Sequence, residues 1–173
     1  MSLLSLPRGI HAGIHIQPRW PARQVQVDAR VIARLSTIQA QLPSAATLIL
    51  TRGYEPPMSR LGAARTGFRA LGIFLFRLFY PGRHAEIADI FGSNGHDTDG
   101  SHIDISVMQD GHRIRLLPLG VFTPRSWQLR RVRLHAHLLS IVREALAQQG
   151  FLIHHNATES LQIHCDLNLP QGA

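Results

Sequence analysis

The sequence predicts a single α+β domain in which helices pack on a mostly antiparallel sheet. The dipeptide Asp110-Gly111 follows one strand pattern and precedes another, and this is the strongest short hairpin signal in the chain. Apolar residues recur every three or four positions over 25–42 and 127–149, as they do in amphipathic helices. No repeat or linker divides the 173 residues, of which 45% are apolar, so one domain with its own core is expected.

The first part of the chain is expected to contain an arm, a helix and a strand. Residues 1–24 form an N-terminal arm ending in a short strand at Ile14–Gln17, and residues 25–173 form the domain. The apolar periodicity predicts a helix over Val25–Leu42, which Pro43 ends. The run Ala46–Thr51 then reads as a core strand.

The remaining elements follow in order along the chain. Residues 58–80 have helical periodicity that Pro81-Gly82 breaks, and His84–Phe91 adds one or two turns. A hairpin follows, with strands at 102–109 and 112–117. Thr123-Pro124 is a typical helix start, which predicts one long helix over 127–149 ended by Gly150. Two closing strands are expected at 151–153 and 161–167.

Charge and composition limit the possible partners. The chain has 18 basic residues, all of them arginine, and 11 acidic residues, so its formal charge is +7. A positive charge favours anionic partners such as nucleic acid or substrates ending in a carboxylate. No nucleic-acid-binding motif is recognisable. The single cysteine, Cys165, excludes an intramolecular disulfide and is interpreted as a small buried hydrophobe. No secretory signal or membrane span is recognisable, so a cytoplasmic protein is expected.

The stretch from Ser93 to Ser106 has the composition of a metal site, with two imidazoles and three carboxylates. His102 and Asp104 alternate with branched aliphatic residues, so a strand here carries its polar groups on one face. His96 lies in the preceding loop, and His164 can come from a second strand. The sequence therefore predicts a zinc site held by His96, Asp104 and His164, with one position open for water.

The order of these features resembles a known superfamily. A core strand ends in Gly53-Tyr54, the segment Gly100-Ser-His-Ile-Asp104 follows, and after a long helix come Gly150-Phe151, Glu159-Ser160 and Ile163-His164-Cys165. This resembles the fold shared by the zinc D-alanyl-D-alanine dipeptidases and carboxypeptidases and the hedgehog signalling domain. The resemblance covers roughly residues 46–167 and makes 58–91 a helical insertion. It implies two zinc ligands from a His-x-x-Gly-x-Ala-x-Asp segment and a third from a later histidine.

Two departures from the family pattern leave the ligand set open. His96 stands four residues before Gly100 instead of three, where Asp97 takes the family's ligand position. His102 replaces the usual alanine and lies on the same strand face as Asp104, which makes it an alternate ligand. We rank His96 first, because imidazole is a better zinc ligand than a second carboxylate and a loop can absorb one extra residue.

The resemblance also implies a catalytic base and a residue that holds the substrate. The family's base is a glutamate before the last histidine, which makes Glu159 the candidate. Its odd spacing from His164 requires either a bulge before Leu161 or a strand that begins only after the glutamate. Arg52 is the nearest substitute for the substrate-holding arginine. Gln162, on the face of His164, can hydrogen-bond a substrate. Of the adjacent His154 and His155, which point to opposite faces, one is a candidate for lining the cleft.

The prediction is a zinc metallopeptidase that acts through a metal-activated water, and the resemblance implies that its substrates are D-amino-acid peptides of the cell-wall type. Such a substrate conflicts with the absence of an export signal unless the protein recycles cytoplasmic peptides or is exported by another route. Two alternatives remain open: a catalytically inactive, zinc-stabilised binding module of the same fold, and an arginine-rich nucleic-acid-binding protein.

Overall fold

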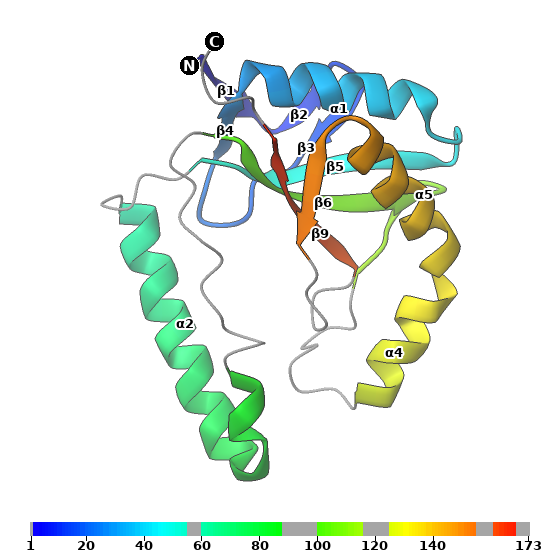
Figure 1. Cartoon of the computed structure of the whole chain (residues 1–173). Helices are drawn as coiled ribbons and strands as arrows, with labels where there is room; N and C mark the ends of the chain where they lie inside the picture. The colour runs from blue at the N-terminus through cyan, green and yellow to red at the C-terminus, as the bar shows by residue number, and fades with distance from the viewer. Residues whose placement is uncertain (1, 55–59, 88–99, 116–124, 155–160, 169–173) are drawn as a thin grey trace.

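The protein is described by a computed structural model, which covers residues 2–54, 60–87, 100–115, 125–154 and 161–168. These residues form a single α+β domain with a mixed sheet (Figure 1). The strands are β1 Leu3–Pro7, β2 Gly9–His11, β3 Ile14–Ile16, β4 Gln24–Asp28, β5 Ala46–Arg52, β6 His102–Gln109, β7 His112–Arg113, β8 Phe151–His154 and β9 Gln162–Leu167. The helices are α1 Ala29–Gln41, α2 Arg60–Phe79, α4 Arg125–Leu134 and α5 Ala136–Gln148, with a 3-10 helix η1 at Pro81–Glu86.

The main sheet has the strand order β2-β3-β5-β6-β9-β8, and β7 pairs with β6. Among the described residues β3 and β5 are parallel and every other pair of strands is antiparallel, as the sequence largely predicted. The predicted hairpin is present, with Asp110 and Gly111 both at positive φ in its turn. Its second strand is shorter than expected, since it ends at Arg113.

The N-terminal arm is part of the β structure. Its predicted short strand is β3, which pairs with β2 and β5. The first strand, β1, pairs with β4 in a separate two-stranded sheet. The arm is therefore held by backbone hydrogen bonds at both of its ends.

Two predicted helices have different boundaries. The helix expected from Val25 begins at Ala29, because Val25 and Val27 alternate with polar residues in β4 and Asp28 caps the helix. The long helix predicted over 127–149 is divided into α4 and α5 at His135, whose φ of −105° and ψ of 7° are not helical. The apolar periodicity of the sequence continues across His135, so periodicity alone could not predict the break between the two helices. The predicted capping pair Thr123-Pro124 lies outside the described residues.

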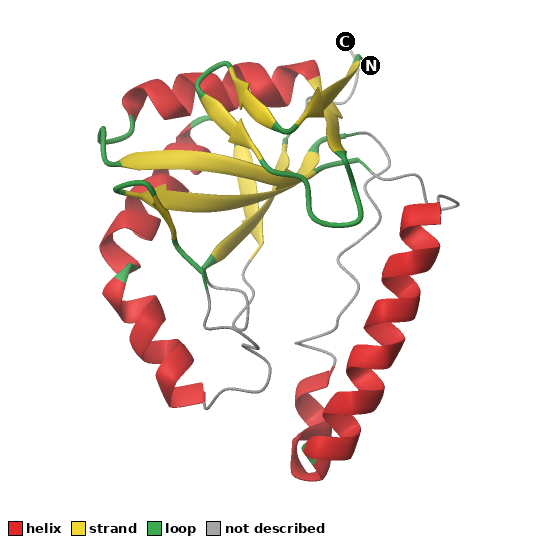
Figure 2. Ribbon diagram, turned by 180° about the vertical axis from the view of Figure 1, so that it is seen from behind, coloured by secondary structure: helices red, strands yellow, loops and turns green. Residues whose placement is uncertain are grey.

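The core lies between one face of the sheet and the helices α1 and α5. Alternate residues of β5, β6 and β9, such as Leu50, Ile105 and Ile163, are buried with residues of α1 and α5. Figures 1 and 2 show these two helices against the sheet, whereas α2 and α4 extend beyond it. None of the helices in the described ranges is long and apolar enough to cross a bilayer. The polar residues of β6 and β9 occupy the face opposite the core.

Asp28 joins β4 to α1 through its carboxylate. Its Oδ1 accepts the backbone N–H of Arg30 at 2.9 Å and the side-chain Nε at 2.8 Å, and Oδ2 accepts Nη2 at 3.0 Å. These hydrogen bonds lower the pKa of Asp28, although burial works in the opposite direction. The ionised form of Asp28 is therefore favoured more strongly in the folded chain than in the unfolded chain.

Asp28 is expected to make the folded state sensitive to acid. Because its pKa is lowered on folding, its contribution is complete above the ordinary aspartate pKa of about 4 and is lost as the pH falls through the lowered value. Asp28→Ala should cost about 1 kcal/mol at neutral pH and flatten this part of the pH profile. Urea unfolding of the wild type and Asp28→Ala at neutral and acidic pH measures both effects, and parallel profiles would contradict the assignment.

Candidate metal centre

The register of the sheet brings the site residues together. Across the β6–β9 ladder Asp104 lies opposite His164, and His102 lies opposite Asp166. On the other side of β6, Arg52 is the partner of Asp104 across an irregularity in β5. Side chains at alternate positions share a face, so these polar groups gather on one surface of three neighbouring strands.

The inner group consists of His102, Asp104 and His164. One ligand atom from each lies within 4.8 Å of the other two. The Nδ1 of His164 is 2.6 Å from Oδ1 of Asp104, and Nε2 of His102 is 3.9 Å from the same oxygen. The side chains of Asp104 and His164 are almost completely buried, whereas that of His102 is 15% exposed. His102 is therefore the member of the group that reaches the surface.

The inner group can hold a metal ion. Within the described ranges, Nε2 of His102 and Oδ2 of Asp104 are buried and have no hydrogen-bond partner. Buried polar atoms in proteins are almost always satisfied, so two such atoms in one cluster mark a place where a metal ion or a water molecule can bind. Two imidazoles and a carboxylate are a donor set typical of zinc and related transition metals.

The charge on Asp104 is stabilised by its neighbours. Burial alone would raise the pKa of Asp104, but the hydrogen bond from His164 and the positive charges of Arg19 and Arg52 bring that pKa below its ordinary value. A carboxylate at this position is thus ionised at neutral pH. An ionised carboxylate is the form that coordinates a cation.

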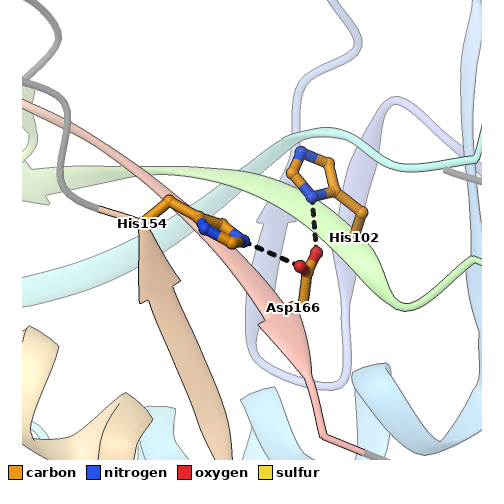
Figure 3. A group of neighbouring side chains, drawn as sticks. All are labelled: His102, His154 and Asp166. Carbon is orange, nitrogen blue, oxygen red and sulfur yellow. Dashed lines mark hydrogen bonds and ion pairs between the residues drawn. The ribbon is translucent and has the colours of Figure 1, made fainter. Parts of the chain in front are cut away.

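An outer group extends from His102 towards solvent. Figure 3 shows Asp166 between two imidazoles, with Oδ1 2.5 Å from Nδ1 of His102 and Oδ2 2.7 Å from Nε2 of His154. Ligand atoms that share one zinc ion lie roughly 3.3 Å apart, given zinc–ligand bonds of about 2.0–2.1 Å. The observed contacts, like the 2.6 Å contact between Nδ1 of His164 and Oδ1 of Asp104 in the inner group, are those of hydrogen bonds. Asp166 therefore acts on His102 as an orienting partner.

The outer group determines which nitrogen of His102 is available to a metal. The carboxylate of Asp166 accepts a hydrogen bond from Nδ1–H, which leaves the lone pair of the neutral ring on Nε2. That nitrogen faces Asp104. Metal-bound histidines usually have their other nitrogen held in this way by a carboxylate or a carbonyl group.

Asp166→Asn is expected to weaken zinc binding about 10- to 100-fold, because the amide no longer fixes the ring of His102 as a carboxylate does. The fold should persist, since the side chain of Asp166 is 35% exposed. Zinc affinity measured by competition with a chelator tests this. Asp110→Asn, an exposed carboxylate in the hairpin turn, is the matched control and should bind zinc like the wild type. Equal affinities for all three proteins would contradict the role of Asp166.

Polar and basic side chains lie beside the inner group. Gln162 is on the predicted face, where its Nε2 donates to the hydroxyl of Thr51 at 3.2 Å and its Oε1 accepts from Arg19. The same arginine has Nη1 3.9 Å from Oδ2 of Asp104. Nη2 of Arg113 donates to Ser106 at 2.7 Å, and burial, with smaller effects of Arg115 and Arg19, lowers the pKa of Arg113 to about 10. The surroundings of the site are therefore positively charged.

The structure groups only part of the predicted site. It brings together Asp104, His164 and the alternate ligand His102, with Gln162 and Arg52 beside them. The first-ranked ligand His96, its competitor Asp97 and the proposed base Glu159 lie outside the described residues, as does His155.

Some neighbours of the site were not predicted. Asp166 follows His164 by two residues, a strand spacing that would have placed it on the same face. No local signal pointed to Arg19 or Arg113, because each reaches the site through tertiary packing. His154, one of two candidates for lining the cleft, belongs to the outer group.

Cys165 does not belong to the site. It is a free, fully buried cysteine, as the sequence predicted, and its neighbours in the strand point to the opposite face. Burial raises the pKa of the thiol, and the charges of Asp104 and Asp166 add to this effect. The side chain is therefore a neutral part of the core.

Comparisons with known proteins do not identify the chain. No protein-family model matches it, and no curated protein matches it. The resemblance to zinc peptidases consequently depends on the motifs of the sequence.

Proposed function

We propose that the chain is a zinc-dependent peptidase related to the D-alanyl-D-alanine dipeptidases and the hedgehog domain, acting on D-amino-acid peptides of the cell-wall type. The observation that supports this most is the inner group, in which two buried ligand atoms, Nε2 of His102 and Oδ2 of Asp104, have no hydrogen-bond partner within the described ranges. The order of motifs along the chain supports the family. Zinc at such a site polarises a carbonyl group and lowers the pKa of a bound water.

Each residue of the site has a task in this proposal. His102, Asp104 and His164 hold the ion, and Asp166 orients His102. Glu159 accepts the proton of the attacking water and passes it to the leaving amine.

The substrate is held by the groups beside the ion. Arg19 and Arg52, whose charges both act on Asp104, attract the carboxylate of a peptide. Gln162 lies next to Arg19 and can donate a hydrogen bond to a substrate carbonyl.

Activity and metal content together test the proposal. The purified protein should contain zinc and hydrolyse D-Ala-D-Ala peptides. Glu159→Gln should lose hydrolysis and retain zinc, whereas Glu144→Gln, an exposed carboxylate on α5, should keep both. A protein without zinc, or a zinc-containing protein that is inert on a broad peptide panel, would exclude the peptidase.

The identity of the third ligand needs a separate pair of variants. His102→Ala should weaken zinc binding, because Nε2 of His102 faces Asp104 in the inner group. If His96→Ala loses zinc while His102→Ala retains it, the loop histidine is the ligand. His137→Ala, an exposed histidine on α5, is the control for general effects of removing an imidazole.

A zinc-stabilised binding module is the second candidate. Asp104 and His164 are 0% and 3% exposed, and such burial is also typical of metal sites that only stabilise a fold. A module of this kind should contain zinc, unfold when a chelator removes it, and cleave no peptide.

A further inference from the structure

The surface of α2 is unusual because it exposes many large apolar side chains on one face. Phe68, Leu71, Phe74 and Leu78 follow one another at three- and four-residue steps, so they share one side of the helix. Each of them, and Phe79, is more than half exposed. A contiguous apolar surface of this kind marks a binding site.

The same helix has a second side that is packed. Phe76 is fully buried, and its ring lies 5.3 Å from that of Tyr80. The apolar face is thus distinct from the side of α2 that carries the buried Phe76. Trp20, from the loop between β3 and β4, enlarges it, since its ring meets that of Phe68 edge-on at 5.4 Å and is itself 76% exposed.

The helix α4 also combines arginines with exposed apolar side chains, and it extends towards the same end of the molecule. Both views show α2 and α4 projecting beyond the sheet in one direction, with the C-terminal end of α2 and the N-terminal end of α4 farthest from it (Figures 1 and 2). Three large apolar side chains of α4 are exposed: Trp127, Leu129 and Leu134.

The charge of these two helices is entirely positive. Each contains four arginines and no acidic residue, so together they have eight of the 18 basic residues of the chain. The side chains of Arg69, Arg77, Arg130 and Arg133 are exposed. Within the described ranges, none of these four forms an ion pair.

We propose that α2 and α4 form a docking surface for an anionic lipid membrane, on which the apolar side chains enter the interface and the arginines contact lipid phosphates. Exposed Phe and Leu beside Arg is the composition of helices that lie in a membrane interface. Exposed tryptophans, such as Trp20 and Trp127, favour the same region of a bilayer. The proposal does not depend on the metal site.

Two other occupants fit this surface less well. A second copy of the chain would bring two acid-free, arginine-rich helices together, and like charges at an interface oppose association. Nucleic acid would pair with the arginines and stack on the exposed aromatic rings, but leucines such as Leu71 and Leu78 offer it neither hydrogen bonds nor stacking. Anionic lipid complements both the charge and the apolar face.

Vesicle binding by the full chain tests the proposal. The protein should co-sediment with vesicles containing phosphatidylglycerol at least about tenfold more strongly than with pure phosphatidylcholine. The only two tryptophans of the chain, Trp20 and Trp127, should report binding as a blue shift of the intrinsic fluorescence. Equal binding to both vesicles, or to neither, would overturn the proposal.

Two matched pairs of variants locate the surface. Phe74→Gln with Leu78→Gln should weaken vesicle binding at least about tenfold, whereas Ile10→Gln with Leu152→Gln, which are equally exposed, should not. Arg69→Gln with Arg77→Gln should reduce binding to anionic vesicles more than Arg8→Gln with Arg23→Gln, although both pairs remove the same charge. If either α2 double variant weakened vesicle binding no more than its control double variant, the assignment of the docking surface to α2 would be overturned.

Two further results would assign the surface to another occupant. The surface would be one for nucleic acid if the protein bound single-stranded DNA in a salt-sensitive way and did not bind vesicles. That DNA binding should persist in the double variant Phe74→Gln with Leu78→Gln. A wild-type dimer that these two substitutions dissociate, seen by analytical ultracentrifugation, would identify a second copy. Either result overturns the lipid proposal.

Discussion

His164→Ala is expected to abolish zinc binding and to lower the free energy of unfolding by about 3 kcal/mol. The substitution removes one of the three candidate ligands of the inner group. It also removes the hydrogen bond at 2.6 Å that satisfies Oδ1 of the fully buried Asp104. An ionised carboxylate without this partner must either stay uncompensated in the core or take up a proton, and both cost stability.

A double variant separates the two effects of His164→Ala. In Asp104→Asn with His164→Ala the carboxylate at position 104 is removed as well, so part of the lost stability should return while zinc binding stays absent. Elemental analysis and urea unfolding, both performed with and without a chelator, measure the two quantities. His137→Ala should match the wild type in both. If His164→Ala keeps zinc and stability, the inner group is not a metal site.

Gly53→Ala is expected to destabilise the fold by about 3 kcal/mol or more. A Cβ atom at this position would lie 2.2 Å from the carbonyl oxygen of Gln26 and 2.4 Å from Cγ1 of Val27. The carbonyl oxygen of Gln26 belongs to the backbone of β4 and cannot turn away as a side chain can, so β4 and the end of β5 would have to separate. The hydrogen bond from the N–H of Tyr54 to the carbonyl of Gln26, at 2.7 Å, would be strained by the same movement.

The matched control for Gly53→Ala is Gly67→Ala. Gly67 is inside α2, and a Cβ there meets nothing within 4 Å. Alanine at this position should therefore stabilise the helix by about 1 kcal/mol. Thermal or urea unfolding of both variants checks that Gly53→Ala lowers the stability and Gly67→Ala raises it. A Gly53→Ala variant with the stability of the wild type would refute the close approach of β4 to Gly53.

A displacement of β4 and β5 should also affect the metal centre. Gly53 directly follows Arg52, which lies opposite Asp104 in the ladder. Zinc affinity should consequently fall in Gly53→Ala even at temperatures where the protein remains folded.

The local elements could be predicted because they depend on local chemistry. Asp110-Gly111 favours positive φ at two successive residues, and this property alone specifies the hairpin. Alternation along 102–107 placed His102 and Asp104 on one face of β6 and the aliphatic residues on the core face. The boundary between β4 and α1 was missed because helical periodicity was extended over two valines that alternate as in a strand.

The site itself was only partly predictable. The identities of Asp104 and His164 followed from a strand pattern and from a motif, but their pairing depends on the register between β6 and β9, which no local signal specifies. The sequence ranked His96 above His102, whereas in the described ranges it is His102 that lies with the candidate ligands Asp104 and His164. The sharing of Asp166 between two histidines depends on three strands at once.

The sequence by itself determined the α+β class, the hairpin, the buried cysteine and the two best ligand candidates, because periodicity and turn chemistry act over a few neighbouring residues. Only the tertiary structure decided that the arm joins the sheet, that Asp166 orients His102, and that Arg19 and Arg113 surround the site. These contacts join residues far apart in the chain. Their geometry depends on strand register and packing, and those are properties of the whole fold.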